Sequence, residues 1–247
     1  MNANQLFGHT RDAVKARYAL RTPSGFVPSS LPGWRGCAVI IQISPAMGAR
    51  FCQYEISMAK NGEGRGRTGS NEMVVYAVEG QCSANFGGKK HSLNAGCFAY
   101  LPPGTDFHFD KPRNARLLIF EKKYEPLAEV AAPEIVTGRA DEAEGQPFLG
   151  NKGARLQALL PGDPRFDMAV NIFTYQPGAT LPFVETHIME HGLLMLAGQG
   201  IYRLDADWHP VQAGDVIWMA PYCPQWFAAM GETPASYIYY KDINRAP

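Results

Sequence analysis

The chain has 247 residues, of which 46% are hydrophobic, and its 23 basic side chains balance its 23 acidic ones. This length and apolar content suit one large globular domain or two smaller ones. The zero formal charge and the lack of Lys or Arg runs leave no basic surface for a phosphate backbone, so no nucleic-acid partner is expected.

Membrane insertion and export are not expected either. Apolar stretches such as 192–197 and 216–221 are far shorter than the roughly 18 residues of a membrane span. Residues 1–10 lack the charged start and apolar stretch of a signal peptide. The five cysteines are odd in number and form no C-x-x-C pair, so neither a disulfide framework nor a thiolate zinc site is predicted. A cytoplasmic location fits these features.

Short strands are predicted along the whole chain. The 25 glycines and 19 prolines punctuate runs rich in Val, Ile, Tyr and Phe, which is typical of an all-β protein. These runs are residues 37–43, 51–58, 73–78, 117–120, 169–175, 216–219 and 236–240. Helical signals are few, and residues 127–135 have room only for a short turn because Pro126 and Pro133 confine them.

An internal repeat is visible in the spacing of the glycines. Gly80 and Gly96 lie 16 residues apart, and Gly198 and Gly214 repeat this spacing 118 residues later. The flanking sequences match in type, since V-V-Y-A-V-E precedes the first pair and L-L-M-L-A precedes the second. The repeat predicts two β-domains of similar plan.

The boundary between the two domains is predicted from composition. The segment 139–152 is rich in Asp, Glu, Gly and Ala, which indicates a linker. The N-terminal domain is therefore placed at residues 1–138 and the C-terminal domain at residues 153–247.

Groups that can bind a metal gather in the second repeat. Glu185, His187 and His191 all occupy odd positions. On a strand, Glu185 and His187 face the same way, and His191 joins them if the strand or its hairpin partner keeps this parity. Gln225 follows a proline-bearing corner, which places it on a neighbouring hairpin of a small barrel.

A metal site is the favoured interpretation of this cluster. A single His or Glu in a β-protein is usually a surface residue or a hydrogen-bonded core group. Here, two of the six histidines lie within five residues, beside a carboxylate, in an otherwise apolar segment. Burying such groups unpaired would be costly, and a divalent cation would offset this cost.

The same stretch, residues 187–191, also matches the H-x-x-E-H pattern of inverted zinc metallopeptidases. That pattern brings its two histidines together only on a helix. Pro182, Gly192 and Gly198 crowd the stretch and leave little room for a stable helix. The peptidase interpretation is a minor alternative.

The second repeat resembles the two metal-binding motifs of the cupin superfamily. Cupins usually hold their metal with two His separated by one residue, a Glu, and a final His. The set found here is Glu185, His187, His191 and Gln225, which departs from the usual pattern at three of the four places. It is similar to the arrangement of the (S)-ureidoglycine aminohydrolases.

This resemblance continues through residues 191–205 and 237–245, and more weakly through most of the chain. It implies a bicupin fold: two tandem double-stranded β-helix (jelly-roll) barrels with few short helices. It also implies hydrolysis of (S)-ureidoglycine to (S)-ureidoglycolate and ammonia in allantoin and purine catabolism. The family's usual metal is manganese, so Mn2+ is expected, although the donor set would also suit Fe2+, Ni2+ or Zn2+.

The first repeat resembles a cupin that has lost its metal. Phe107 stands at the ligand place of the second motif, and residues 62–71 offer Gly, Arg and Ser where histidines are expected. Glu72 alone cannot hold a divalent ion, and His108 would point to the opposite face of its strand. The N-terminal domain is expected to be a scaffold or an oligomerisation partner.

Three further residues are the candidate catalytic groups. Strand alternation places Tyr237 and Lys241 on one face, and the resemblance adds Tyr202 to the pocket. It implies that Lys241 pairs with the substrate carboxylate or donates a proton, that both tyrosines are hydrogen-bonding walls, and that Glu185 also contacts substrate. Such groups are needed because the leaving amine must gain a proton and the attacking water must lose one.

Two other functions stay open from the sequence. Two histidines and one carboxylate also describe the facial triad of Fe(II) enzymes, so a cupin dioxygenase acting on a small substrate is one alternative. A non-enzymatic cupin that binds a small ligand is the other. In every case the partner is a small molecule, and a homo-oligomer is expected because cupins commonly associate.

Overall fold

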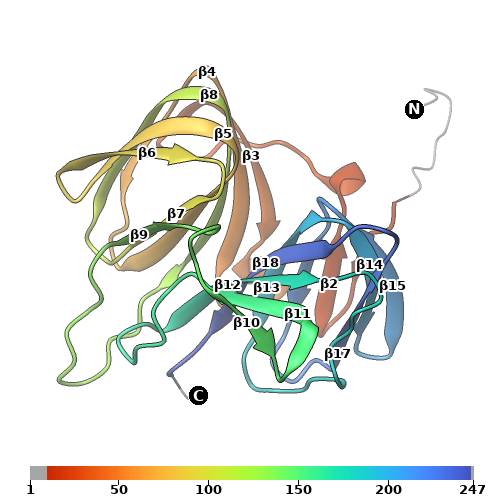
Figure 1. Ribbon diagram of the computed structural model, residues 1–247. Coiled ribbons are helices and arrows are strands. Elements are labelled where there is room, and N and C mark those ends of the chain that lie inside the picture. Colours follow the sequence, from red (N-terminus) through yellow and green to blue (C-terminus); the bar gives the residue numbers. More distant parts are fainter. Residues whose placement is uncertain (1–9, 246–247) are drawn as a thin grey trace, which may run out of the picture.

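The computed structural model describes residues 10–245, and its regular secondary structure is almost entirely β-strand (Figure 1). Within this range the only helices are two short 3-10 turns, Pro23–Gly25 and Pro45–Met47, as predicted for an all-β fold with few short helices. All seven predicted runs coincide with strands, most of them longer than predicted. No helix among the described residues is long and apolar enough to cross a membrane.

The N-terminal half forms one sheet in the order β3-β4-β8-β5-β7-β9, with β6 paired to β5. Its strands are β3 (Trp34–Ile43), β4 (Cys52–Arg67), β5 (Asn71–Phe86), β6 (Lys89–Asn94), β7 (Cys97–Leu101), β8 (Asp106–Lys123) and β9 (Val136–Arg139). The pairing of β5 with β8 shifts register at three points. Such irregularities bend strands, and the long strands curl over in the manner of a jelly roll (Figure 1).

The C-terminal half has an eight-stranded sheet, in the order β1-β2-β16-β13-β18-β12-β11-β10, and a three-stranded sheet, β15-β14-β17. The strands are β1 (Ala13–Val14), β2 (Tyr18–Arg21), β10 (Gly145–Phe148), β11 (Asn151–Ala158), β12 (Met168–Tyr175), β13 (His191–Ala197), β14 (Gln199–Leu204), β15 (Asp207–Gln212), β16 (Val216–Met219), β17 (Gln225–Met230) and β18 (Ala235–Asp242). Buried side chains from both sheets share one core.

The predicted repeat is confirmed by equivalent hydrogen bonds in the two halves. The Gly96 N–H donates to the Ala77 carbonyl, and 118 residues later the Gly214 N–H donates to the Met195 carbonyl, both at 2.8 Å. The repeat glycines all have positive φ: Gly80, Gly96, Gly198 and Gly214. This conformation strains other residues, so the recurring glycines mark the same corner in each barrel.

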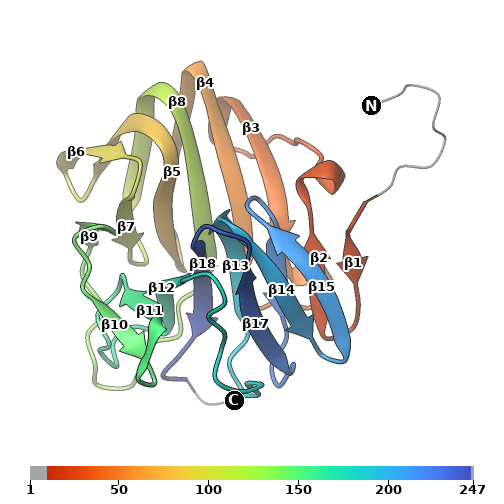
Figure 2. The same cartoon turned by 45° about the vertical axis from the view of Figure 1, so that its right-hand side comes forward.

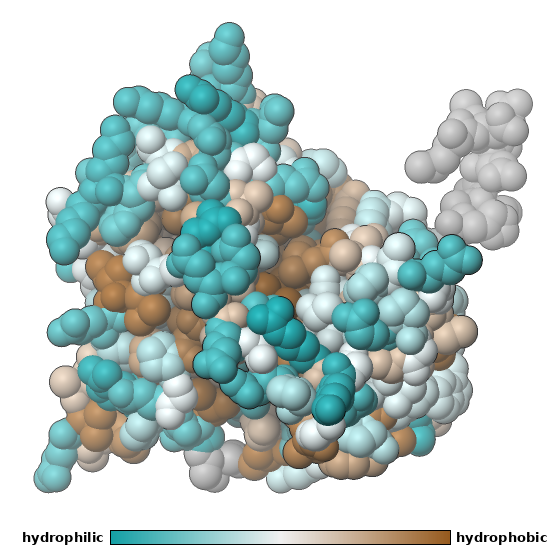
Figure 3. All heavy atoms as spheres, viewed as in Figure 1, coloured by the Kyte–Doolittle hydropathy of each residue, from teal (hydrophilic) through white to brown (hydrophobic). Residues whose placement is uncertain are grey.

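The apolar residues form three cores, one inside each barrel and one between the halves. Alternation along a strand supplies two of them at once. On β5, Val75 points into the N-terminal barrel and Val74 into the middle layer. On β18, Tyr237 points into the C-terminal barrel and Ile238 into the middle layer. Burial on both faces explains the continuous apolar runs of the sequence, and hydrophobic residues are visible at the junction of the halves in Figure 3.

The first strands of the chain belong to the second sheet. β2 pairs antiparallel with β16, so residues 13–21 extend the sheet of the C-terminal half (Figure 2). The predicted linker 139–152 contains β10, which joins the same sheet, and the last residue of β9, which pairs with β7. The division at residues 138 and 153 stays a prediction, and the strand pairing shows that residues 13–21 cross it.

A polar cluster is buried within the middle layer. The Tyr100 hydroxyl donates to Glu72 Oε2 (2.7 Å), and Lys122 bonds Asp167, which comes from the other half. Glu72 has no solvent exposure. Burial, followed by the neighbouring Asp167, raises the pKa of Glu72 to about 9. Glu72 is therefore protonated in the folded protein at neutral pH.

This protonated carboxyl makes stability depend on pH. The folded-state pKa of Glu72 lies above its unfolded value. Its contribution to the unfolding free energy is therefore complete at acidic pH and is lost as pH rises toward about 9. We expect Glu72→Gln, which is permanently neutral, to gain unfolding free energy relative to wild type as pH rises from about 5 to about 9, by at most about 1.4 kcal/mol per pH unit. Urea unfolding at a series of pH values measures this difference, and parallel curves for the two proteins would contradict it.

An ion pair links Arg11, just before β1, to the C-terminal half. Arg11 donates through both Nη atoms to Asp215 (2.6 and 2.7 Å), whose side chain has no exposed surface. We expect Arg11→Met to lower the unfolding free energy by about 1–3 kcal/mol, because a buried carboxylate loses its cation. Arg35→Met is the control, since Arg35 is 75% exposed and bonds only Glu63, and it is expected to change little. Equal effects of the two substitutions would contradict the assignment.

Candidate active site

Five of the seven predicted site residues come from four strands of the C-terminal half. His191 is the first residue of β13, Tyr202 lies on β14, and Gln225 is the first residue of β17. Tyr237 and Lys241 lie on β18. His191, Tyr202, Gln225 and Tyr237 line one cavity inside the barrel.

Glu185 and His187 lie in the loop before β13, so the strand alternation expected from the sequence does not apply to them. A two-way backbone bridge fixes this loop instead. The Glu185 N–H donates to the Gln225 carbonyl (2.8 Å), and the Gln225 N–H donates to the Glu185 carbonyl (2.9 Å). The Tyr222 N–H also donates to the His187 carbonyl (2.7 Å). The loop is thereby tied to the corner that precedes β17.

The two imidazoles face each other through their Nε2 atoms, which are 3.1 Å apart. His187 Nδ1 is 3.1 Å from the Met189 carbonyl. A carbonyl accepts only from an N–H, so His187 carries its proton on Nδ1 and presents a lone pair at Nε2. Burial is the main cause that lowers the pKa of both histidines, so both are neutral at neutral pH.

This arrangement fits a bound cation. Neutral imidazoles whose second nitrogen is held by a carbonyl are the usual form of metal-ligating histidine. Adjacent ligands on an octahedral ion with bonds of about 2.1 Å lie about 3 Å apart, which matches the separation of the two Nε2 atoms. The Gln225 amide nitrogen lies 3.0 Å from His187 Nε2, and turning the amide over presents its oxygen at the same place.

Glu185 lines the same cavity as His191 and Gln225. Among residues 10–245, however, no three His, Cys, Asp or Glu side chains are grouped closely enough to hold an ion as they stand. The carboxylate completes the donor set only by turning toward the imidazoles. Burial raises the pKa of Glu185, and the charge of Lys241 opposes this. The cavity has a volume of about 20 Å³, close to the space that one water or one ion needs.

Phenol groups form the inner wall of the cavity. The Tyr202 hydroxyl donates to Gln225 Oε1 (3.3 Å), and the Tyr237 and Tyr175 hydroxyls are 3.2 Å apart. Burial raises the pKa of Tyr202 and Tyr237 well above the ordinary value. Both therefore stay protonated and act as hydrogen-bond donors rather than bases.

Lys241 is next to His191 in the sheet, since the two residues pair across β13 and β18. It is partly buried. Burial lowers the pKa of Lys241, and the nearby Glu185 carboxylate works in the opposite direction. An ammonium with a lowered pKa releases its proton more readily than an exposed lysine does.

The peptidase interpretation is wrong. Residues 187–190 form no helix, so His187 and His191 meet across a loop and a strand end rather than along a helix face. Glu190, the glutamate of that motif, has no exposed surface and accepts hydrogen bonds from Arg50 and from Trp218 Nε1. It packs in the layer between the halves.

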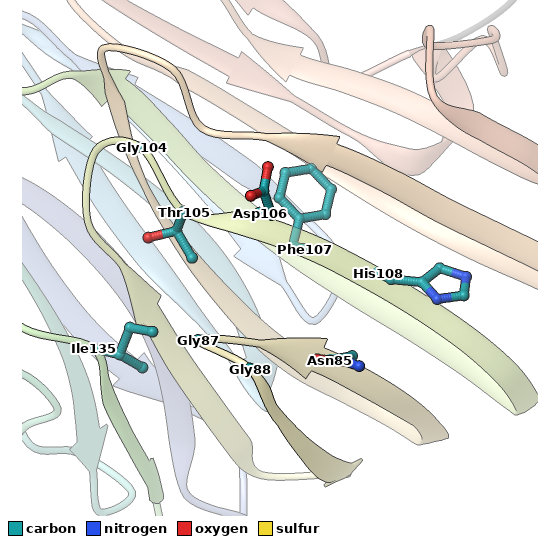
Figure 4. A pocket seen from close by; sticks show the side chains of 9 residues that line it. All are labelled: Asn85, Gly87, Gly88, Gly104, Thr105, Asp106, Phe107, His108 and Ile135. Atoms are coloured by element: carbon teal, nitrogen blue, oxygen red, sulfur yellow. The ribbon is translucent and has the colours of Figure 1, made fainter.

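A larger cavity, of about 570 Å³, lies in the N-terminal half. Figure 4 shows Phe107 and His108 on adjacent positions of β8 pointing in different directions. Phe107, the counterpart of Gln225, packs near Trp34 with ring centroids 6.4 Å apart. His108 Nε2 lies 3.0 Å from Glu63 Oε1. This cavity brings together no set of groups like that in the C-terminal barrel.

Some cavity residues were not expected from the sequence. Phe173, Leu193, Met219 and Tyr239 complete the lining of the site. Their alternation along predicted strands could have indicated which face they occupy. Apolar residues of this kind also fill the N-terminal barrel, so their identity carries no signal for a site.

Gln225 is the candidate metal ligand whose role a single substitution tests most directly. We expect Gln225→Leu, which removes the amide, to weaken binding of an added divalent cation about tenfold or more while the protein stays folded, because a candidate donor beside the imidazole pair is lost. Titration with Mn2+ followed by electron paramagnetic resonance measures the affinity. Gln199→Leu, an exposed position on β14, is the control, and equal affinities would contradict the assignment.

The chain matches the family model described as the Cupin domain over residues 171–240. It is 40% identical over 243 residues to the (S)-ureidoglycine aminohydrolase of Arabidopsis thaliana, covering 97% of this chain and 80% of that protein. It is 35% identical to the (S)-ureidoglycine aminohydrolase of Escherichia coli K12, covering 98% of this chain and 97% of that protein.

Solved structures agree with these relatives. A putative glyoxylate-induced protein from Pseudomonas aeruginosa superposes with a TM-score of 0.88 at 30% identity, covering 99% of this chain and 94% of that one. Oxalate decarboxylase from Bacillus subtilis superposes with a TM-score of 0.71 at 12% identity, covering 96% and 80%. The decarboxylase shares the fold alone, and the Mn(II) centres described for it are a property of that enzyme.

Proposed function

Because the chain belongs to the (S)-ureidoglycine aminohydrolase family, we propose that it hydrolyses (S)-ureidoglycine to (S)-ureidoglycolate and ammonia in the degradation of allantoin and purines. The observation that carries this proposal is the pair of neutral imidazoles, His187 and His191, facing each other beside Gln225 inside a barrel that also holds Lys241. The substrate is a small molecule, as a site enclosed by one barrel requires.

We propose Mn2+ as the metal. Its ligands would be Glu185, His187, His191 and Gln225, a set of nitrogen and oxygen donors without a thiolate, which also suits Fe2+, Ni2+ or Zn2+. When bound, such an ion supplies Lewis acidity and anchors the substrate. The neutral state of both histidines supports this assignment, because protons do not compete with the ion at neutral pH.

The reaction breaks one C–N bond and forms one C–O bond. The departing amine takes up a proton and leaves as ammonia, and the attacking water gives up a proton. Lys241 is the proposed donor at Nζ, since burial lowers its pKa. Glu185 is the proposed acceptor of the proton from water, because burial raises the pKa of its carboxyl group. The positive charge of Lys241 acts on the same carboxylate.

The remaining residues hold the substrate. Tyr202 and Tyr237 present protonated hydroxyls as hydrogen-bond donors at the wall of the cavity, and we propose that they donate to the ureido oxygen or the carboxylate of a substrate bound beside it. Lys241 can also pair with the substrate carboxylate before it acts as an acid. A cytoplasmic location and assembly into a homo-oligomer are further parts of the proposal.

Ammonia release tests the function. We expect purified protein loaded with Mn2+ to release ammonia from freshly generated (S)-ureidoglycine, and chelation to abolish this activity until Mn2+ is returned. His187→Ala should lose both activity and bound metal, whereas His91→Ala, in the N-terminal half, should keep both. Elemental analysis and a coupled ammonia assay measure the two quantities.

Three outcomes would contradict the proposal. Oxygen consumption without ammonia release would favour an Fe(II) oxygenase. Inactivity toward ureidoglycine at full metal occupancy would show that the substrate is another molecule, and His187→Ala with unchanged metal content would show that the metal assignment is wrong.

A further inference from the structure

We infer that Arg50, a residue of the N-terminal half, positions His191 and Lys241 from outside the C-terminal barrel. The inference rests on the proposed function, because it concerns how two of its residues are held. Arg50 lies just before β4 and is far from the site in sequence, since its contact with Glu190 spans 140 residues.

The register of the sheet places both residues at the end of the ladder between β13 and β18. His191 opens β13 and pairs with Lys241, which is the penultimate residue of β18. This is the last pair of the β13–β18 ladder, and the residues before His191 form a loop. On their other sides His191 pairs with Met219 of β16 and Lys241 pairs with Ala169 of β12. Between β13 and β18 themselves the ladder ends here, and only side-chain contacts link the two strands beyond this pair.

Side chains on the opposite face supply these contacts. Glu190 precedes His191, and Asp242 follows Lys241. The Glu190 N–H donates to Asp242 Oδ1 (2.6 Å), so a carboxylate takes the place of the next ladder carbonyl. Both carboxylates then face away from the cavity, toward the layer between the halves.

Arg50 binds both carboxylates. Its backbone N–H donates to Glu190 Oε1 (3.0 Å), its Nε approaches the same oxygen (3.3 Å), and its Nη2 donates to Asp242 Oδ2 (2.7 Å). Trp218 Nε1 donates to Glu190 Oε2 (3.3 Å). One planar guanidinium therefore bridges the residues that flank the imidazole and the ammonium of the site. A lysine cannot reproduce this bridge, because it has a single point of charge.

A similar cluster lies under the other barrel and shows what a purely structural role looks like. Glu72 and Tyr100 stand 118 residues before Glu190 and Trp218, and Tyr100 likewise donates to Glu72. No ligand set stands above that cluster, since Met73 takes the place of His191. The arrangement therefore recurs as interface packing, and only the Arg50 copy lies against a site.

The experiment compares Arg50→Met and Arg50→Lys with Arg116→Met. Arg116 is a matched control, because it also bridges two carboxylates, Glu55 and Glu79, but within the N-terminal half. We expect Arg50→Met to weaken Mn2+ binding about 10-fold or more and to lower kcat/KM by a similar factor, with a melting temperature close to that of Arg116→Met. Arg50→Lys should recover only a small part. Arg116→Met should bind Mn2+ like wild type.

Added guanidinium gives a second readout. The Arg50 side chain is 47% exposed, so millimolar guanidinium should reach the gap in Arg50→Met and restore part of the Mn2+ affinity and activity, with no effect on Arg116→Met. Wild-type affinity in Arg50→Met, or equal losses in Arg50→Met and Arg116→Met, would overturn the inference. If wild type releases no ammonia, the proposed function fails, while the difference in Mn2+ affinity still tests the role of Arg50.

Discussion

The Nε2 atoms of His187 and His191 approach to 3.1 Å, and the candidate site of the C-terminal half depends on this close contact between two neutral rings. His187 Nε2 also lies 3.0 Å from the Gln225 amide, which donates to it or, turned over, presents its oxygen, and burial opposes protonating either ring. The fold nevertheless brings the rings together through backbone contacts at both ends of the loop. A cation held between the nitrogens, as we propose, would add a further attraction to this contact.

The two barrels show how one plan supports different contents. In the N-terminal barrel the ligand places hold apolar side chains, with Met73 at the place of His191 and Phe107 at the place of Gln225. Its interior is stabilised by burial alone. The C-terminal barrel buries polar side chains at the equivalent places, so less apolar surface is buried there. The apolar layer between the two halves also packs against this barrel.

Much of this could be predicted from the sequence. The glycine spacing predicted the repeat, and the residue types at 185, 187, 191 and 225 predicted the candidate donor set. The argument from strand parity was wrong for Glu185 and His187, because they lie in a loop that a bridge to Gln225 holds in place. Arg50 could not be found, since nothing local marks an arginine whose partners lie 140 or more residues away.

The N-terminal strand β2 lies beside β16, almost 200 residues further along the chain. Chains emerge from the ribosome with their first residues leading, and domains generally fold as they are completed. The C-terminal barrel cannot close in this way, because its edge is made first and its remaining strands last. β2 can pair with β16 only after both halves have been synthesised, and contacts that span so much of the sequence form slowly.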